Sequence, residues 1–181
     1  MLVVHVRSNK MDSRDWIFQQ YVKELASKKR KPLTSKRRPM LQVAVKKLHK
    51  DAVVPQYAKP GDAGLDLTAT SIIENTTFQV TYGTGLAFEI PTDHVGLIFP
   101  RSSVRNYELT LSNCVGVIDS GYRGEICFTF NKTNGLDSLK YKVGDRIGQM
   151  VIIPYPQVQL IEETDLSETE RGKNGFGSTG K

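Results

Sequence analysis

The chain has 181 residues, enough for one domain with a full hydrophobic core and too few for two. Hydrophobic residues make up 39% of it and charged residues 24%, which is typical of a soluble globular protein. No apolar run approaches the ~20 residues that cross a bilayer, and the first residues lack a cleavable apolar segment, so the sequence predicts neither a membrane span nor a secretory signal.

Positive charge is concentrated in residues 1–39, which contain eleven Lys or Arg and three Asp or Glu. Residues 40–181 contain fourteen Lys or Arg and sixteen Asp or Glu, so this larger part carries a slight negative charge. Apolar residues at helical spacing predict a helix over residues 13 to about 29, and the basic stretch after it is typical of a flexible linker. We expect a basic extension, partly helical or disordered, that binds nucleic acid at most weakly and without sequence preference.

From Met40 onward, short β-rich runs alternate with Gly, Pro, Asn and Asp. This pattern predicts an all-β sandwich, barrel or jelly roll. The expected strands are 41–48, 77–81, 85–90, 94–99, 108–111, 115–118, 125–131 and 150–161. The end of the chain is rich in charge and glycine, so we divide this part into a β domain at 40–165 and a flexible arm at 166–181.

Cys114 and Cys127 are the only cysteines, and their spacing matches no metal-ligand pattern. Each lies in an apolar, strand-like run, which favours buried, reduced thiols in a reducing compartment. A disulfide between neighbouring strands is the alternative interpretation.

The stretch from Gly116 to Glu125 places a carboxylate, an aromatic ring and a guanidinium on a glycine-bounded turn between two apolar runs. It predicts a hairpin with Asp-Ser-Gly at its turn. Asp119 is the best candidate for catalysis, because an ionised carboxylate can orient and partly deprotonate a water molecule. Read alone, Asp119 is more typical of a simple β-turn, and Tyr122 of a half-buried strand aromatic.

Four other segments accompany this stretch in order, namely Pro60–Leu67, Pro100–Ser103, Gly144–Met150 and Arg171–Gly180. Arg101, Ser102 and Ser103 offer a cation and two hydroxyls that can hold phosphate oxygens. Arg171 can pair with a phosphate through two hydrogen bonds. Together the five segments resemble the five motifs of the trimeric dUTP diphosphatases (dUTPases), over roughly residues 41–181.

The resemblance implies a jelly-roll-like (β-clip) subunit of a homotrimer whose subunits share their active sites. It implies Mg²⁺-dependent hydrolysis of dUTP to dUMP and pyrophosphate, with water attacking the α-phosphorus. Such a reaction limits uracil incorporation into DNA and supplies dUMP for dTTP synthesis. We expect a cytoplasmic protein, or a nuclear one if its source is eukaryotic or viral.

The resemblance also assigns roles to residues. Asp119 positions the attacking water, Ser102 steadies the leaving group and Gln149 hydrogen-bonds the phosphates. Tyr122 packs under the deoxyribose, the main chain near Val117 reads uracil, and Asp66 contacts Mg²⁺ through water. The expected substrate-binding residues are Arg101, Ser102, Ser103, Asn113, Gly116, Val117, Ile118, Asp119, Tyr122, Gln149, Arg171, Phe176, Gly177 and Ser178.

Two alternatives remain open at this point. The dCTP deaminases share this β fold and an Arg-Ser-Ser stretch like that of Arg101–Arg105, but Thr129 stands where they carry a catalytic glutamate. A regulatory or nucleic-acid-binding protein would instead use residues 1–39 and carry a vestigial enzyme domain.

Overall fold

The computed structural model describes residues 19–20, 23 and 40–175. Residues 19, 20 and 23 are helical and exposed; the rest of the helix expected over residues 13–29 lies outside the described residues. The chain divides into two units, Met1–Leu41 and Gln42–Lys181. Every strand of the described part belongs to the second unit, and no described helix is long and apolar enough to cross a membrane.

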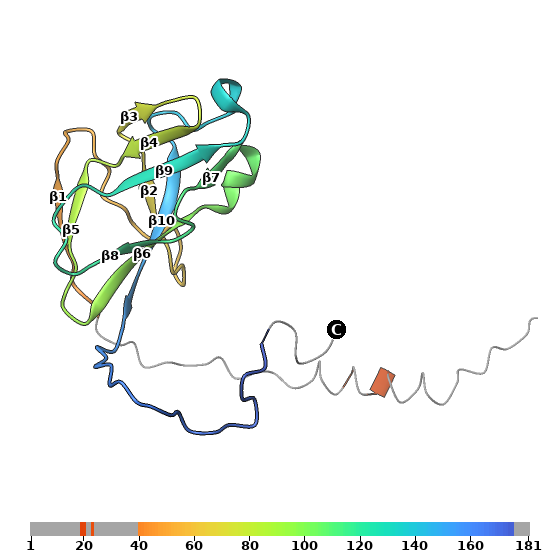
Figure 1. The fold of residues 1–181 in the computed structure, drawn as a ribbon. Helices are drawn as coiled ribbons and strands as arrows, with labels where there is room; N and C mark the ends of the chain where they lie inside the picture. Colours follow the sequence, from red (N-terminus) through yellow and green to blue (C-terminus); the bar gives the residue numbers. More distant parts are fainter. Residues whose placement is uncertain (1–18, 21–22, 24–39, 176–181) are drawn as a thin grey trace, which may run out of the picture. The chain divides into compact units, whose positions relative to one another are not determined.

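The strands of the described part form three antiparallel sheets (Figure 1). A two-stranded sheet joins β1 (Ala44–Lys47) to β5 (Leu86–Glu89). The β6 sheet has the order β2 (Leu65–Thr68), β10 (Arg146–Pro154), β6 (His94–Pro100) and β8 (Gly116–Ile118). The β9 sheet has the order β3 (Ser71–Asn75), β4 (Gln79–Gly83), β9 (Cys127–Lys132) and β7 (Leu109–Leu111). Two short 3₁₀ helices, η1 (Ser102–Asn106) and η2 (Gly135–Asp137), complete the described elements, and the expected all-β fold is confirmed.

Alternation along the strands sends one face of each four-stranded sheet into a shared core. In β9, Phe128 and Phe130 are fully buried, while Thr129 between them is partly exposed. The same core cluster takes Leu67, Ile98 and Met150 from the β6 sheet and Val80 and Tyr82 from the β9 sheet. The core therefore fixes where β6, β8 and β9 stand, and these three strands carry most of the site.

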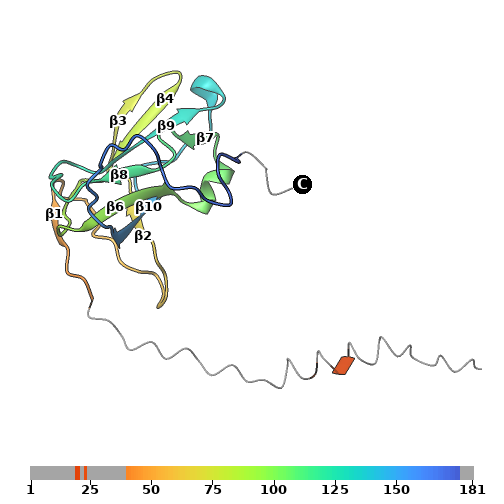
Figure 2. The same ribbon diagram turned by 60° about the horizontal axis from the view of Figure 1, so that its bottom comes forward.

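The tight turn predicted at Asp119 is confirmed, because the Tyr122 amide donates to the Asp119 carbonyl oxygen at 3.0 Å. The predicted hairpin around it is wrong. β8 pairs with β6, whereas β9 pairs with β4 and β7, so the strands that flank the turn belong to different sheets (Figure 2). The segment 119–126, which we call the crossover loop, passes from one sheet to the other.

Two strands lie where the sequence predicts none, β2 and β3. Asp66 consequently belongs to a strand rather than to the preceding turn. The last expected strand, 150–161, is displaced, since β10 begins at Arg146 and ends at Pro154. Proline cannot donate a main-chain hydrogen bond to a sheet, and Pro154 and Pro156 together stop the strand there.

The expectation of buried thiols is wrong for Cys114, which is exposed in the turn between β7 and β8. Its φ of 58° lies in the left-handed region, which a strand residue does not adopt. Cys127 is partly exposed on β9. Both thiols are free, so the alternative of a disulfide is also wrong.

Candidate active site

Six of the expected substrate-binding residues line one pocket of about 280 Å³, the Asp119 pocket. They come from the turn before β8, from β8 itself and from the crossover loop. Their names are Asn113, Gly116, Val117, Ile118, Asp119 and Tyr122, and the remaining lining residues are Ile98, Glu125, Ile126 and Cys127.

β8 brings its main chain to the pocket because it is the edge strand of the β6 sheet. One side of β8 pairs with Gly96–Ile98 of β6, so the N–H and C=O groups of its other side have no strand partner within the described residues. Such an edge can hydrogen-bond a planar ligand as it would another strand. Gly116 is required for this close packing, since a Cβ there would overlap the Ile98 side chain.

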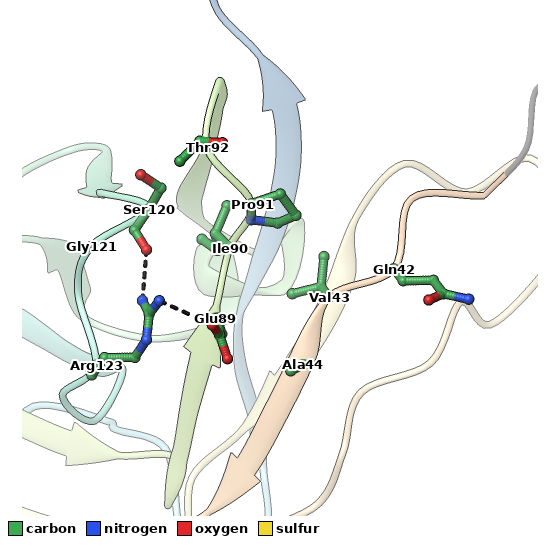
Figure 3. A pocket seen from close by; sticks show the side chains of 10 residues that line it. All are labelled: Gln42, Val43, Ala44, Glu89, Ile90, Pro91, Thr92, Ser120, Gly121 and Arg123. Atoms are coloured by element: carbon green, nitrogen blue, oxygen red, sulfur yellow. Dashed lines mark hydrogen bonds and ion pairs between the residues drawn. The ribbon is translucent and has the colours of Figure 1, made fainter.

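The crossover loop holds Asp119 and Tyr122 at the pocket. The Asp119 residue is exposed, and the Tyr122 side chain donates its hydroxyl to the Glu125 carbonyl oxygen at 3.1 Å. Arg123 braces the loop, because its guanidinium donates to the carbonyl oxygens of Ser120 at 2.6 Å and Tyr122 at 3.0 Å. The same guanidinium lies 3.5 Å from the Glu89 carboxylate (Figure 3).

Ser120, Gly121 and Arg123 also line a larger, open pocket of about 650 Å³, whose other walls are residues 42–44 and 89–92 (Figure 3). None of its lining residues has a role predicted from the sequence. Its lining combines aliphatic residues with a few uncharged polar ones and the Arg123–Glu89 ion pair. We therefore place the candidate site at the smaller Asp119 pocket.

A second group of expected residues gathers around Asp66, and we call it the Arg101 cluster. Arg101 donates Nε–H to one Asp66 carboxylate oxygen at 2.8 Å, and Arg146 donates to the other at 3.0 Å. Arg101 also reaches the Ser103 hydroxyl at 3.4 Å, on η1. The three charged groups sum to one positive charge, which favours an anion at this place.

Gln149 belongs to the same cluster through the register of β10, where it pairs with Asp66 on one side and Phe99 on the other. Its amide donates to the Pro100 carbonyl oxygen at 3.2 Å. A Cβ on Gly64 would overlap the Gln149 amide, so the glycine of the first motif makes room for the glutamine of the fourth. Ser102, at the start of η1, is exposed beside Arg101.

Asp119 and Arg101 lie near opposite ends of β6 within one chain, although the Asp119 pocket itself extends as far as Ile98. Ile118 pairs with Gly96, so Asp119 follows at the level of Val95, whereas Arg101 lies six residues further along. At ~3.3 Å per strand residue, these levels are about 20 Å apart. One subunit therefore holds the Asp119 residue itself far from the Arg101 residue.

Comparison with known proteins decides the family. The profile described as dUTPase matches residues 50–180. The chain belongs to the dUTPase family. It is 39% identical over 142 residues to the deoxyuridine 5'-triphosphate nucleotidohydrolase of Thermobifida fusca, which covers 77% of this chain and 79% of that protein. The protein of the same name from Nautilia profundicola is 41% identical over 144 residues, covering 78% and 100%.

The solved structures agree. The dUTPase of Staphylococcus bacteriophage 80alpha, determined with dUPNHPP, has a TM-score of 0.68 and 28% identity, and the match covers 78% of this chain and 99% of that one. The dUTPase relationship, the jelly-roll-like fold and the expectation of a dUTP diphosphatase enzyme are thereby confirmed. The family match also decides against a dCTP deaminase. In agreement with this, the Thr129 hydroxyl lies 3.0 Å from that of Thr81 on the neighbouring strand.

The arm of this dUTPase is described only in part. Arg171 is exposed and donates to the Asn174 carbonyl oxygen at 3.2 Å. Phe176, Gly177 and Ser178 lie outside the described residues.

Glu125 and Arg146 were not among the residues predicted from the sequence, although both lie inside motifs of the dUTPase family. Glu125 lines the Asp119 pocket, and Arg146 completes the Arg101 cluster. Arg146 could have been found from its positive charge, which lies two residues after a glycine turn and complements the negative charges of the aspartates in the first motif. Cys127 was interpreted only as a structural thiol. Burial, followed by the nearby Glu125 carboxylate, raises its pKa to about 11, so it stands in the pocket as a neutral group at neutral pH.

A resident metal site is not built by the described residues of this dUTPase, which contain no group of three or more His, Cys, Asp or Glu suited to a metal ion. Asp66 already accepts a hydrogen bond from a guanidinium on each of its oxygens. This arrangement fits a metal ion that arrives on a triphosphate and touches Asp66 through water better than one bound directly.

Proposed function

We propose that this dUTPase hydrolyses dUTP to dUMP and pyrophosphate in a Mg²⁺-dependent reaction, without a covalent intermediate. The observation that carries the proposal is the Asp119 pocket, where the Asp119 carboxylate, the Tyr122 ring and a free strand edge line the same space. The names of the relatives, deoxyuridine 5'-triphosphate nucleotidohydrolases, support dUTP as the substrate. The reaction keeps uracil out of DNA and supplies dUMP.

Asp119 acts as the general base. Its carboxylate stands on an exposed turn whose main-chain hydrogen bond does not use the side chain, so both oxygens remain available to a water molecule. A carboxylate at hydrogen-bond distance from water orients it for attack on the α-phosphorus and accepts its proton.

The base and sugar are read by β8 and the crossover loop. The free edge of Gly116–Ile118 offers main-chain donors and acceptors to uracil, and Asn113 lies beside it in the pocket. Tyr122 presents its ring at the place assigned to the deoxyribose, where packing leaves no space for a 2′-hydroxyl. Specificity for dUTP over UTP is therefore steric.

The Arg101 cluster binds the phosphates. Arg101 and Ser102 supply a cation and a hydroxyl at the start of η1, Ser103 and Gln149 stand beside them, and Arg171 contributes from the arm. Charge-assisted hydrogen bonds of this kind bind phosphate oxygens strongly. When bound, Mg²⁺ would neutralise charge on the triphosphate; Asp66, which holds two arginines, would be the residue near it, through water.

Because Asp119 and Arg101 are about 20 Å apart along β6 in one chain, we propose a homotrimer in which different subunits complete each site. The segment after β10 supports this assembly. Val158, Leu160, Ile161 and Leu166 are between 73% and 91% exposed there. Apolar side chains so exposed in sequence are typical of a surface covered by another subunit.

The activity is tested by incubating the purified protein with dUTP, dCTP, UTP and dTTP and separating the products by chromatography. We expect dUMP and pyrophosphate from dUTP alone. In Asp119→Asn, turnover should fall by about 10² or more, the range for loss of a general base, with dUTP binding retained. Asp137→Asn, an exposed carboxylate on η2, is the matched control. Near-normal turnover of a folded Asp119→Asn protein would refute the assignment.

The shared site is tested by complementation. Light scattering should give a trimer. Mixing Asp119→Asn chains with chains truncated after Glu170 should restore part of the activity that each lacks alone, because one kind supplies the base and the other the arm. An active monomer, or no restoration after subunit exchange, would contradict the shared site.

A further inference from the structure

Three hydrogen bonds converge on Glu125, a residue without an assigned role. Its carboxylate accepts the Gly85 amide at 2.6 Å, a short distance typical of a charge-assisted bond. Its main-chain carbonyl accepts the Tyr122 hydroxyl at 3.1 Å, and the Cys127 thiol lies 3.7 Å from the same oxygen. Glu125 thus connects the ring of Tyr122 to the turn between β4 and β5.

The turn between β4 and β5 is shaped to receive this carboxylate. A Cβ on Gly83 would come within 2.5 Å of the Glu125 carboxylate oxygen, so only glycine leaves space for it. Gly85 has a φ of 65°, which presents its amide to Glu125 at little steric cost. Thr84 between them donates its amide and its hydroxyl to the Ile126 carbonyl oxygen, at 3.2 and 2.7 Å.

The position of the Tyr122 ring is restricted by the main chain of the two residues before Ile126. A Cβ on Gly124 would overlap the Tyr122 hydroxyl, so the ring lies directly over the Gly124 main chain. The hydroxyl then ends on the carbonyl of Glu125, the next residue. Because Tyr122 is otherwise 44% exposed, this hydroxyl bond and the glycine surface beneath it are what fix the ring.

We propose that Glu125 is a positioning residue that sets the Tyr122 ring, and through it the discrimination of dUTP against UTP. The inference rests on the proposed function for the identity of the substrate. The carboxylate anchors the main chain of Glu125 to the β4–β5 turn, and this main chain anchors the ring. If the anchor is lost, the ring shifts and a 2′-hydroxyl finds space.

Two substitutions separate the effect of the length of the Glu125 side chain from the effect of its charge. Glu125→Gln keeps a side-chain oxygen at the same distance from the Gly85 amide but removes the charge. Glu125→Asp keeps the charge but is one methylene shorter, so it does not reach that amide. We expect Glu125→Asp to lower the ratio of kcat/KM for dUTP to that for UTP about tenfold, the size of effect of one buried hydrogen bond, and Glu125→Gln to lower it less than about threefold.

Hydrogen exchange gives a readout that does not depend on turnover. The Gly85 amide should exchange slowly in the wild-type protein and in Glu125→Gln, and much faster in Glu125→Asp. A dUTP-to-UTP ratio that is unchanged in Glu125→Asp although Gly85 has become unprotected would overturn the inference. A ratio lowered by Glu125→Gln and not by Glu125→Asp would overturn it as well, because charge and not position would then matter.

Tyr122→Phe completes the test, since it removes the hydroxyl that Glu125 accepts. If Glu125 acts through this ring, the double variant Glu125→Asp/Tyr122→Phe should discriminate no worse than the more impaired single variant. Effects that multiply would refute the route through Tyr122. Absence of dUTP turnover in the wild-type protein would instead overturn the proposed function, so the two failures are distinguishable.

Discussion

Replacing Asp66 by asparagine keeps the shape of the side chain and removes the charge that two arginines share. Asp66 is 25% exposed, Arg101 24% and Arg146 55%. Two unit charges about 4 Å apart interact by about 4 kcal/mol at an effective dielectric constant of ~20, and desolvation and side-chain ordering remove most of this in partly exposed pairs. Because the amide leaves two guanidinium groups facing one weak acceptor, we expect a loss of about 1–3 kcal/mol in the free energy of unfolding.

Urea unfolding at low and high salt measures this loss. Asp62→Asn is the matched control from the same motif, since its carboxylate is exposed and, among the described residues, accepts the nearby Lys59 amide at 2.8 Å. We expect Asp62→Asn to cost less than about 0.5 kcal/mol, as exposed substitutions usually do. The Asp66→Asn loss should shrink with salt, which screens the more exposed Arg146 pair. Equal stability of the two variants at low salt would refute the account of Asp66 as the residue that holds both arginines.

The same variant distinguishes two contributions to activity. If Asp66 also contacts Mg²⁺ through water, Asp66→Asn should need more Mg²⁺ for half-maximal turnover. If it only holds the arginines, the Mg²⁺ requirement should stay constant while KM for dUTP rises. An unchanged kcat/KM would exclude both contributions.

Three further outcomes are expected. Truncation after Glu170 removes Arg171 and should leave the unfolding transition intact while dUTP turnover falls steeply; unchanged kinetics would show that the arm has no role in binding. A chain that starts at Met40 should retain dUTP hydrolysis and lose any salt-sensitive binding to DNA in a mobility-shift titration, because it loses the basic extension. Iodoacetamide at about pH 8 should label exposed Cys114 before Cys127. The thiolate is the reactive form, so Cys127 labelling, followed by mass spectrometry, should rise only as the pH approaches its pKa of about 11.

Local signals in the sequence predicted the turn at Asp119 but not what the turn connects. A hairpin and a crossover between sheets require the same glycine-bounded turn, and only the pairing partners differ. Packing in the core decides these partners. Phe128 and Phe130 of β9 belong to the core and β9 pairs with β4, whereas β8 pairs with β6. The chemistry assigned to the turn residues did not depend on this choice, so six of the expected residues could still be placed at one pocket.

The errors at Asp66 and Cys114 have different causes. The turn signal of Pro60–Gly64 extended the predicted turn too far and hid β2, whose Asp66 faces two cations supplied by distant segments. Conversely, apolar neighbours hid the turn at Cys114, where φ is positive. At Asp66, contacts with remote residues decide the conformation, whereas the turn at Cys114 is local, with the Cys114 amide donating to the Leu111 carbonyl oxygen at 3.1 Å. Arg146 was missed for the same reason as Asp66, because its partner in the described part of the chain is 80 residues away.

In every single chain, the seven-residue strand β6 separates the general base, Asp119, from the phosphate-binding groups around Arg101. Under the shared-site proposal, a newly made chain has no dUTPase activity until it assembles. Activity then follows the concentration of trimer rather than the total concentration of protein. Specific activity should then decline on dilution below the dissociation constant of the assembly and recover on reconcentration. Inactive chains would also lower the activity of active ones in mixed trimers. Each defective copy contributes residues to sites whose other residues come from its neighbours.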